Sequence, residues 1–298
     1  MLMDITDLLI TIYCIVDDSL HLLLKGQPLR KRGPAPALSD AEAITLVIVS
    51  ELSGIHADKY IWRYCWNTWH AWFPRLGSRS AFVRQIAGLW QMIQQLHALV
   101  IRWVGVKLDA THVIDGFPIR VCRYARAQRC RLFMGEASLG YCAAQKEYFY
   151  GFKGHLLVTE DGWIVDATVT SATIDEREAA WDVLDGIFGW LIADKGYISL
   201  AFNENLRKIG VHLRTPLRKN MVDPDHIWEK QGYGPRRRIV ETIIDQVTQD
   251  LGLAEMRARD LWHMTVRVGR KLLAHTLANL LCWRAGLRPT QHTQLLAA

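Results

Sequence analysis

The hydrophobic positions of the first hundred residues recur with the period of an α-helix. Apolar side chains three or four positions apart continue to about residue 102, which predicts a series of helices. A capping box formed by Ser39 and Glu42 marks the start of one of them. The expected helices include residues 43–52, 61–69 and about 80–103. The sequence therefore predicts an all-helical N-terminal domain over residues 1–105.

One of these helices carries large aromatic side chains at helical spacing, namely Trp62, Trp66, Trp69 and Phe73. Such a stripe is more often part of a core than a platform for nucleic-acid bases, because stacking platforms usually lie on strands or in grooves. We expect these side chains to be buried. The succession of helix, short turn and helix also matches a helix-turn-helix, although no helix has a basic recognition face.

The hydrophobic period changes to two at Val106, which is the period of a β-strand. A first strand is expected at 113–119 and a second at 148–158. The turn sequence Glu160-Asp161-Gly162 should lead from the second strand into a returning strand at 163–169. Residues 190–193 are apolar on both faces, which is typical of a central parallel strand.

Three further elements complete this half of the chain. Thr173 and Glu176 form a second capping box, which predicts a helix to about residue 188. A short strand is expected at 211–215, and Gly234-Pro235 should begin a long helix that reaches about Gly252. Strands that alternate with helices in this order predict an α/β fold with a mixed sheet.

The composition is that of a globular protein. Of 298 residues, 50% are hydrophobic and 22% are charged, which excludes disordered chains and disulfide-bonded miniproteins. No apolar run reaches the roughly 18 residues of a membrane span, and acidic residues interrupt the apolar N-terminal stretch. None of the 6 cysteines forms a CxxC pair, so buried reduced thiols are expected. We expect a cytoplasmic protein that makes no use of a membrane.

The charge is distributed unevenly around the net value of +6. Residues 101–150 carry a net charge of about +4, residues 151–200 about −6 and residues 251–298 about +5. Basic flanks on either side of an acidic middle suggest a polyanion held around a carboxylate-rich site. This distribution is typical of enzymes that act on nucleic acids.

Three carboxylates are candidates for that site. Asp115 lies in the first strand, and Asp194 closes the apolar strand at 190–193. If these two strands are neighbours, both carboxylates lie at one end of the sheet, where ligands bind in open α/β folds. Glu241 flanks the apolar stripe of the long helix, and Arg237 and Thr248 lie on the same side of that helix.

Acidic oxygens without His or Cys suit the hard divalent ions Mg²⁺ and Mn²⁺ and do not suit zinc. Two such ions about 4 Å apart can activate a nucleophile and stabilise the leaving oxygen of a phosphodiester. The alternative is that each acid is only a helix cap or a surface charge.

Five segments in order along the chain resemble the DDE transposases of bacterial insertion sequences. They are residues 113–122 (VIDGFPIRVC), 149–156 (FYGFKGHL), 192–198 (IADKGYI), 217–221 (LRKNM) and 236–246 (RRRIVETIIDQ). The greatest similarity is to the insertion sequence 982 group, which is related to the insertion sequence 4 type.

The resemblance implies an RNase H-like DDE catalytic domain over residues 106–298, including C-terminal helices. It assigns Asp115, Asp194 and Glu241 as the triad that binds two Mg²⁺ ions, for which Mn²⁺ is expected to substitute, and Arg237 as the arginine before the glutamate. The implied activity is cleavage and joining of double-stranded DNA at the terminal inverted repeats and in target DNA, by a homodimer on DNA. The helical domain would bind DNA, dimerise, or do both.

The sequence departs from the family pattern at two positions. Gly234 stands where relatives have a tyrosine, with Tyr233 one step away, and Thr248 stands where they have a lysine. Lys195 or Arg238 are therefore candidates for the contacts to the terminal phosphate. Asp109, in the sequence Asp109-Ala-Thr, is a rival for the first acid because such a strand also occurs in these enzymes.

Further basic residues are candidates for binding the DNA backbone. Arg120, Arg123 and Arg126 begin a basic run that Arg129 and Arg131 continue, and Lys153 lies on the polar face of the hairpin strand. Two other functions remain open from the sequence. One is a nuclease of the same fold that only hydrolyses DNA, and the other is a non-catalytic DNA-binding protein, either a decayed transposase or a regulator.

Overall fold

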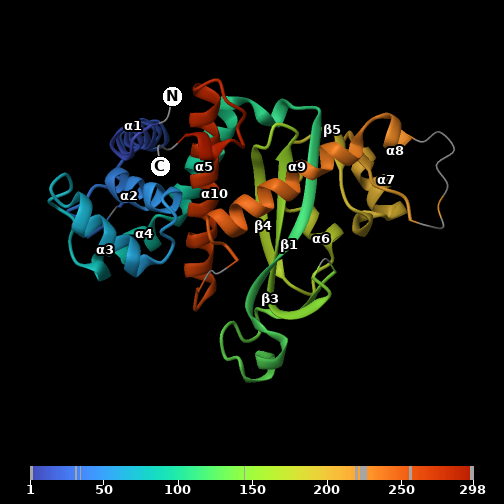
Figure 1. Ribbon diagram of the computed structural model, residues 1–298, viewed down its shortest axis with the longest axis horizontal. Coiled ribbons are helices and arrows are strands. Elements are labelled where there is room, and N and C mark those ends of the chain that lie inside the picture. Colours follow the sequence, from blue (N-terminus) through green and yellow to red (C-terminus); the bar gives the residue numbers. More distant parts are fainter. Residues whose placement is uncertain are drawn as a thin grey trace. The chain divides into compact units, whose positions relative to one another are not determined.

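The structure is a computed structural model that describes residues 3–30, 32–33, 35–143, 145–218, 221, 227–254 and 257–295 (Figure 1). The chain divides into two compact units. The first is formed by Met1–Val100 together with Gln249–Ala298, and the second by Ile101–Thr248. None of the helices in these described ranges combines the length and the apolar character that a membrane span requires.

The first unit is helical. Its elements are α1 (Ile5–Leu24), α2 (Asp40–Leu52), α3 (Asp58–Trp69), α4 (Arg79–Gly88), most of α5 (Trp90–Val104), and α10 (Leu261–Arg284). The predicted capping box of α2 is confirmed, because the Ser39 hydroxyl accepts from the Glu42 N–H at 3.1 Å and the Glu42 carboxylate accepts from the Ser39 N–H at 2.7 Å.

Two expectations for this unit need correction. The helix expected at 80–103 is broken at Leu89, which has a non-helical ψ of 8° and follows the weak helix former Gly88. The aromatic stripe is only partly core: Trp69 and Phe73 are buried, whereas Trp66 is 39% exposed. Trp66 instead stacks on Trp62, with ring centroids 5.2 Å apart.

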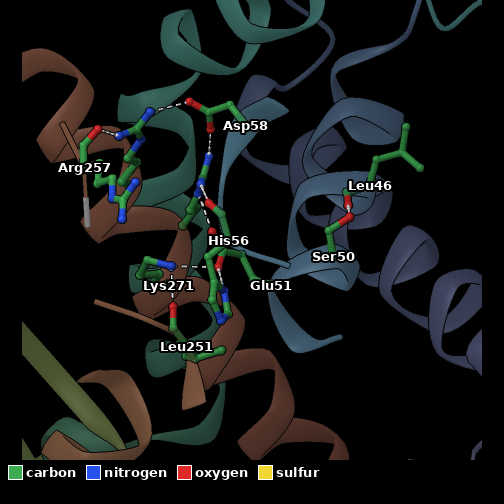
Figure 2. A network of polar contacts seen from close by, with 10 residues as sticks. Leu46, Ser50, Glu51, His56, Asp58, Leu251, Arg257 and Lys271 are labelled. Carbon is green, nitrogen blue, oxygen red and sulfur yellow. Dashed lines mark hydrogen bonds and ion pairs between the residues drawn. The ribbon is translucent and has the colours of Figure 1, made fainter. Parts of the chain in front are cut away.

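The C-terminal helix α10 belongs to the helical unit, whereas the sequence grouped residues 249–298 with the catalytic domain. Its packing is explained by a buried ionic network (Figure 2). Glu51 of α2 is fully buried and accepts from Arg270 at 2.5 Å and from Lys271 at 2.7 Å. Arg270 also pairs with Asp58 at 2.6 Å. Buried cations on α10 thus find their carboxylates on the N-terminal helices.

The second unit is built on one mixed sheet. Its strands are β1 (Thr111–Arg123), β2 (Ser138–Cys142), β3 (Glu147–Thr159), β4 (Ile164–Ser171), β5 (Gly189–Ile192) and β6 (Val211–Arg214). The order along the sheet is β2-β3-β1-β5-β6, and β4 also pairs with β3. The predicted hairpin between β3 and β4 is confirmed, as is the central position of β5, which pairs in parallel with both β1 and β6.

Strand β3 is long enough to pair with two different strands along one edge. Its first part, from Glu147 to Gly151, pairs with β2, and its second part, from Phe152 to Val158, pairs with β4, so two strands share one edge of β3. A glycine is required at Gly154, because a Cβ there would lie 2.4 Å from the ring of Phe117 on β1.

The helices of this unit are α6 (Glu176–Ala180), α7 (Leu200–Lys208), α8 (Ile227–Lys230) and α9 (Tyr233–Asp245), which is followed by a π-helical turn at Gln246–Asp250. The helix expected from Thr173 to about residue 188 is wrong in extent. Asp175 is the N-cap and accepts from the Arg177 N–H at 2.9 Å, and the helix ends at Ala180. The predicted fold class, a mixed sheet flanked by helices after a helical N-terminal region, is confirmed.

Candidate active site

Two of the predicted acids lie side by side at one end of the sheet. β1 and β5 are adjacent and parallel, with Val113 opposite Ile192. Asp115 and Asp194 each stand two residues further on, at the carboxyl end of that pairing. The interpretation of these strands as neighbours is therefore confirmed, and the backbone brings the two carboxylates to the same place. Asp194 is exposed, and the side chain of Asp115 is 21% exposed.

Helix α9 carries Glu241, the third of the predicted acids. Val240 and Ile243 are fully buried, and the helix packs against β1, β3 and β5 (Figure 1). Arg237 Nη1 lies 3.1 Å from Asp115 Oδ2, and its other terminal nitrogen is ion-paired with Glu241. The guanidinium of Arg237 thus joins the carboxylate on β1 to the carboxylate on α9.

The charge of Asp115 is destabilised by its surroundings. Burial raises the pKa of Asp115 to about 6, and the negative charges of Asp194 and Glu176 contribute to the increase. The N–H of Gly116, which donates to Asp115 Oδ1 at 2.8 Å, and the cation of Arg237 act in the opposite direction. Several carboxylates therefore act on one another here.

Glu176 is a member of this group that the sequence did not identify. Its Oε2 lies 2.5 Å from the position that a Cβ of Gly196 would occupy, so it sits directly on the backbone that follows Asp194. Its Oε1 is 3.3 Å from the Nζ of Lys153. From the sequence, Glu176 was expected only to cap a helix. The signal that could have identified it is Gly196, which has no side chain to fill the space that Glu176 occupies.

Tyr197 lies beneath the acids. Its side chain is fully buried, and its hydroxyl has no hydrogen-bond partner among the residues that the structure describes. Burial raises the pKa of Tyr197 well above its usual value, and the charges of Glu176, Asp115 and Asp194 add to this effect. The neutral phenol is therefore the form present at any pH that the protein would normally meet.

The rival first acid lies elsewhere. Asp109 precedes β1 and follows the 3₁₀ turn Val106–Leu108, and its pKa is raised by burial and by Asp161 of the β3–β4 turn. It is therefore before the start of the β1–β5 pairing, whereas Asp194 is beyond its end. The geometry therefore places Asp194 near Asp115 and not near Asp109.

The predicted basic residues have different surroundings. Lys153, expected to contact phosphate, is ion-paired with Glu176. The guanidinium of Arg120 lies over the ring of Phe149, with 5.7 Å to the ring centroid. The side chains that are exposed are Arg123, Arg126, Lys195 and Arg238.

The two departures from the family pattern also have structural counterparts. Tyr233 is buried, so its side chain is not exposed in place of the tyrosine that relatives have at position 234. The hydroxyl of Thr248 donates to the carbonyl oxygen of Ile244 at 2.7 Å, within its own helical segment. The two candidates for the contacts to the terminal phosphate, Lys195 and Arg238, are both exposed.

The acids fit a hard divalent cation by their chemistry. They offer only carboxylate oxygens, and burial together with the charges of Asp194 and Glu176 raises the pKa of Asp115, an effect that a bound cation would oppose. Across the described residues, no group of three or more His, Cys, Asp and Glu side chains is close enough to hold a metal ion. Arg237 is the cation between Asp115 and Glu241 in this arrangement.

Asp115→Asn is expected to stabilise the metal-free protein at pH 8 but not at pH 4. The pKa of Asp115 is raised from 3.8 to about 6, so the folded state holds this proton more tightly than the unfolded state does. The stability that comes from this proton is complete below pH 4 and is lost as the pH rises through 6. The expected gain at pH 8 is about 1–3 kcal/mol in the free energy of unfolding.

Urea unfolding of both proteins at the two pH values measures this gain. Asp185→Asn, which removes an exposed carboxylate from the same unit, is the control and should leave the free energy of unfolding unchanged. An equal effect of Asp115→Asn at pH 4 and pH 8 would contradict the prediction.

Arg237→Gln and Glu176→Gln are expected to shift the pKa of Asp115 in opposite directions. The cation of Arg237 lowers this pKa and the charge of Glu176 raises it. Losing Arg237 should therefore raise the pKa further, and losing Glu176 should lower it. Carboxyl-carbon NMR titration of Asp-labelled protein measures both shifts, with exposed Arg238→Gln on the same helix as the control. Shifts of the same sign would show that the two groups do not act on Asp115 as separate charges.

Comparisons with known proteins relate the chain to a family and to a solved structure. A family model described as a transposase DDE domain matches residues 106–261. No curated protein sequence matches the chain significantly. Among solved structures, the chain resembles the piggyBac transposase in its cryo-EM synaptic complex with hairpin DNA, with a TM-score of 0.51 and 9% sequence identity over 95% of this chain and 76% of that chain. Because the family match spans more than half of the sequence, the chain belongs to the transposases with a DDE domain.

Proposed function

We propose that this chain cleaves and joins DNA strands at the ends of a bacterial insertion sequence of the insertion sequence 982 group, by two-metal phosphoryl transfer in the cytoplasm. The observation that carries the proposal is the register of β1 and β5, which brings Asp115 and Asp194 together, with Glu241 connected to them through Arg237. The transposase family of the chain supports the reaction class.

Asp115, Asp194 and Glu241 would hold the divalent ions, with Mg²⁺ the proposed metal. When bound, two such ions activate the attacking oxygen and stabilise the leaving oxygen of a phosphodiester. Asp115 must be ionised for this role, which its pKa of about 6 permits at neutral pH. Arg237 would then exchange its carboxylate partners for a DNA phosphate, since a guanidinium binds both kinds of oxyanion in the same geometry.

The proposed substrate is double-stranded DNA with the terminal repeats of the element. The piggyBac structure is a synaptic complex with hairpin DNA, which supports DNA as the partner of this chain as well. Exposed Lys195 and Arg238 would hold the backbone near the acids, and Arg123 at the end of β1 and Arg126 in the following 3₁₀ turn would hold it further away. Because two ends must be joined in one reaction, we propose a homodimer on DNA, with the helical unit binding DNA, dimerising or doing both.

The test is a reaction of labelled duplex carrying the end of the element with supercoiled target DNA, in Mg²⁺, Mn²⁺ or EDTA. We expect cleavage at the end and labelled end covalently joined to target, both only with metal. Cleavage without joining would favour a nuclease that only hydrolyses DNA. Tight binding without cleavage in any metal would favour a non-catalytic DNA-binding protein and would indicate that the changes at Gly234 and Thr248 disable the enzyme.

A further inference from the structure

The end of β1 and the segments that follow it extend the sheet beyond the acids. Residues 120–150, called the arm below, contain the end of β1, a 3₁₀ turn at Tyr124–Arg129, β2 and the first residues of β3. Figure 1 shows the arm projecting from the end of the sheet, in green. The arm is separate along β1 from the acids of the candidate active site.

The arm is packed internally and against the next residues of β3. Phe149 is buried, and the ring centroids of Phe133 and Phe152 are 5.1 Å apart with an edge-on contact. The hydroxyl of Tyr150 donates to the carbonyl oxygens of Leu132 and Phe133, at 3.2 Å and 3.1 Å. These contacts fix the loop between the 3₁₀ turn and β2, so the surface of the arm has a defined shape.

One face of the arm exposes three tyrosines. Tyr124, Tyr141 and Tyr148, called the tyrosine patch below, are 55%, 47% and 56% exposed. Tyr141 lies directly opposite Tyr148 in the ladder of β2 and β3, and their ring centroids are 4.9 Å apart. The ring of Tyr124 is 5.7 Å from that of Tyr148. Leu139 extends the exposed apolar surface. A continuous aromatic surface of this kind is typical of a binding site.

The charge around the patch identifies the kind of partner. Six basic residues against two acidic ones occupy positions 120–148. The exposed arginines are Arg123, Arg126, Arg129 and Arg131, and none of these four forms an ion pair within the described part of the chain. Four exposed arginines without an ion-pair partner require anionic groups, and the phosphates of a nucleic-acid backbone supply these at regular spacing. A nucleic acid provides both phosphates for the arginines and flat bases for the rings.

We propose that the tyrosine patch stacks on unpaired bases of a DNA strand whose phosphates the arginines of the arm hold. Stacking requires an open base face, which paired bases inside a duplex do not offer. Tyr124 stands nine residues beyond Asp115 along an extended strand, which is a distance of about 30 Å or roughly eight to nine base pairs. The patch therefore binds DNA away from the cleaved phosphate. This inference rests on DNA as the partner in the proposed function.

The test compares the binding of the full chain to two labelled DNAs, a single-stranded oligo(dT) of about 20 nucleotides and a duplex of the same length. Binding is measured in EDTA by the fluorescence anisotropy of the labelled DNA. Replacing all three tyrosines of the patch by leucine should weaken single-strand binding about tenfold to a hundredfold and duplex binding less than about threefold. Replacing the same three by phenylalanine keeps the rings and should retain binding. Arg126→Gln with Arg129→Gln should weaken both DNAs and reduce the salt dependence of binding.

Equal losses on both DNAs, or no loss with leucine, would overturn the inference, as would loss with phenylalanine. Urea unfolding of each variant confirms that the leucine protein is folded. The cleavage reaction described above separates this inference from the proposed function. If the parent cuts no DNA while the leucine variant selectively loses single-strand binding, the transposition proposal fails and the stacking surface stands. If the parent cuts and joins DNA while the leucine variant binds single strands normally, only the stacking surface fails.

Discussion

The Asp194→Asn protein is expected to bind the end of the element and leave it uncut. Asparagine keeps the size of the side chain but removes the charge that a divalent ion needs at the carboxyl end of β5. We expect single-turnover cleavage to fall by at least about a thousandfold in both Mg²⁺ and Mn²⁺, with DNA affinity in EDTA changed less than about threefold. The measurement is nicking of labelled duplex beside a binding titration.

Four further variants make this result specific. Asp115→Asn should have a similar effect, and the double variant Asp115→Asn with Asp194→Asn should be no worse than either single variant, because the acids act as one unit. Asp185→Asn, exposed in the same unit, should cut normally. If Asp109→Asn blocked cleavage while Asp115→Asn did not, the first acid would be Asp109 and the pairing with Asp194 would be wrong.

Glu51→Ala is expected to cost about 3–5 kcal/mol in the free energy of unfolding, which is a large part of the stability of an ordinary protein. The reason is the network in Figure 2, where the carboxylate of Glu51 meets Arg270, Lys271 and His56 without access to water. Removing the acid leaves the buried ammonium of Lys271 without the carboxylate of Glu51, and it leaves Arg270 with Asp58 as its carboxylate partner. Chemical denaturation followed by circular dichroism measures the loss.

A matched variant separates the lost charge from lost packing. Replacing Glu51, Arg270 and Lys271 together by leucine, methionine and methionine removes all three charges and keeps an apolar core, so stability should recover to within about 1–2 kcal/mol of the parent. Glu42→Ala, in the exposed cap of α2, should cost no more than about 1 kcal/mol. A Glu51→Ala protein as stable as the Glu42→Ala protein would mean that the cations find other partners.

The sequence was sufficient where a local pattern determines the structure. Four apolar residues followed by Asp194 required a buried parallel strand with a carboxylate at its end, and the alternation on both sides of Asp161 required a hairpin. These are features that a short window of residues contains. That β1 and β5 are neighbours was only a condition at the level of the sequence, and the pairing of the two strands in the structure meets it.

Other features depend on residues far apart in the chain. Nothing near Glu51 indicates that its partners are 219 and 220 positions away on α10, so the sequence alone does not group that helix with the N-terminal helices. Glu176 resembles any acid in the first turn of a helix, and only the packing of α6 on Gly196 gives it a place beside Asp194. For α6 itself, Thr173 and Asp175 were both suitable caps, and the local sequence does not decide between them.

The division of the first unit between the two ends of the chain has a consequence for synthesis. The N-terminal helices leave the ribosome long before α10, so during translation the carboxylate of Glu51 has neither Arg270 nor Lys271 to pair with. The sheet unit lies wholly within Ile101–Thr248 and can assemble while α10 is still being made. The helical unit cannot be complete until α10 has been synthesised. The nascent chain therefore passes through a stage in which the sheet unit can be folded while the helical unit is not.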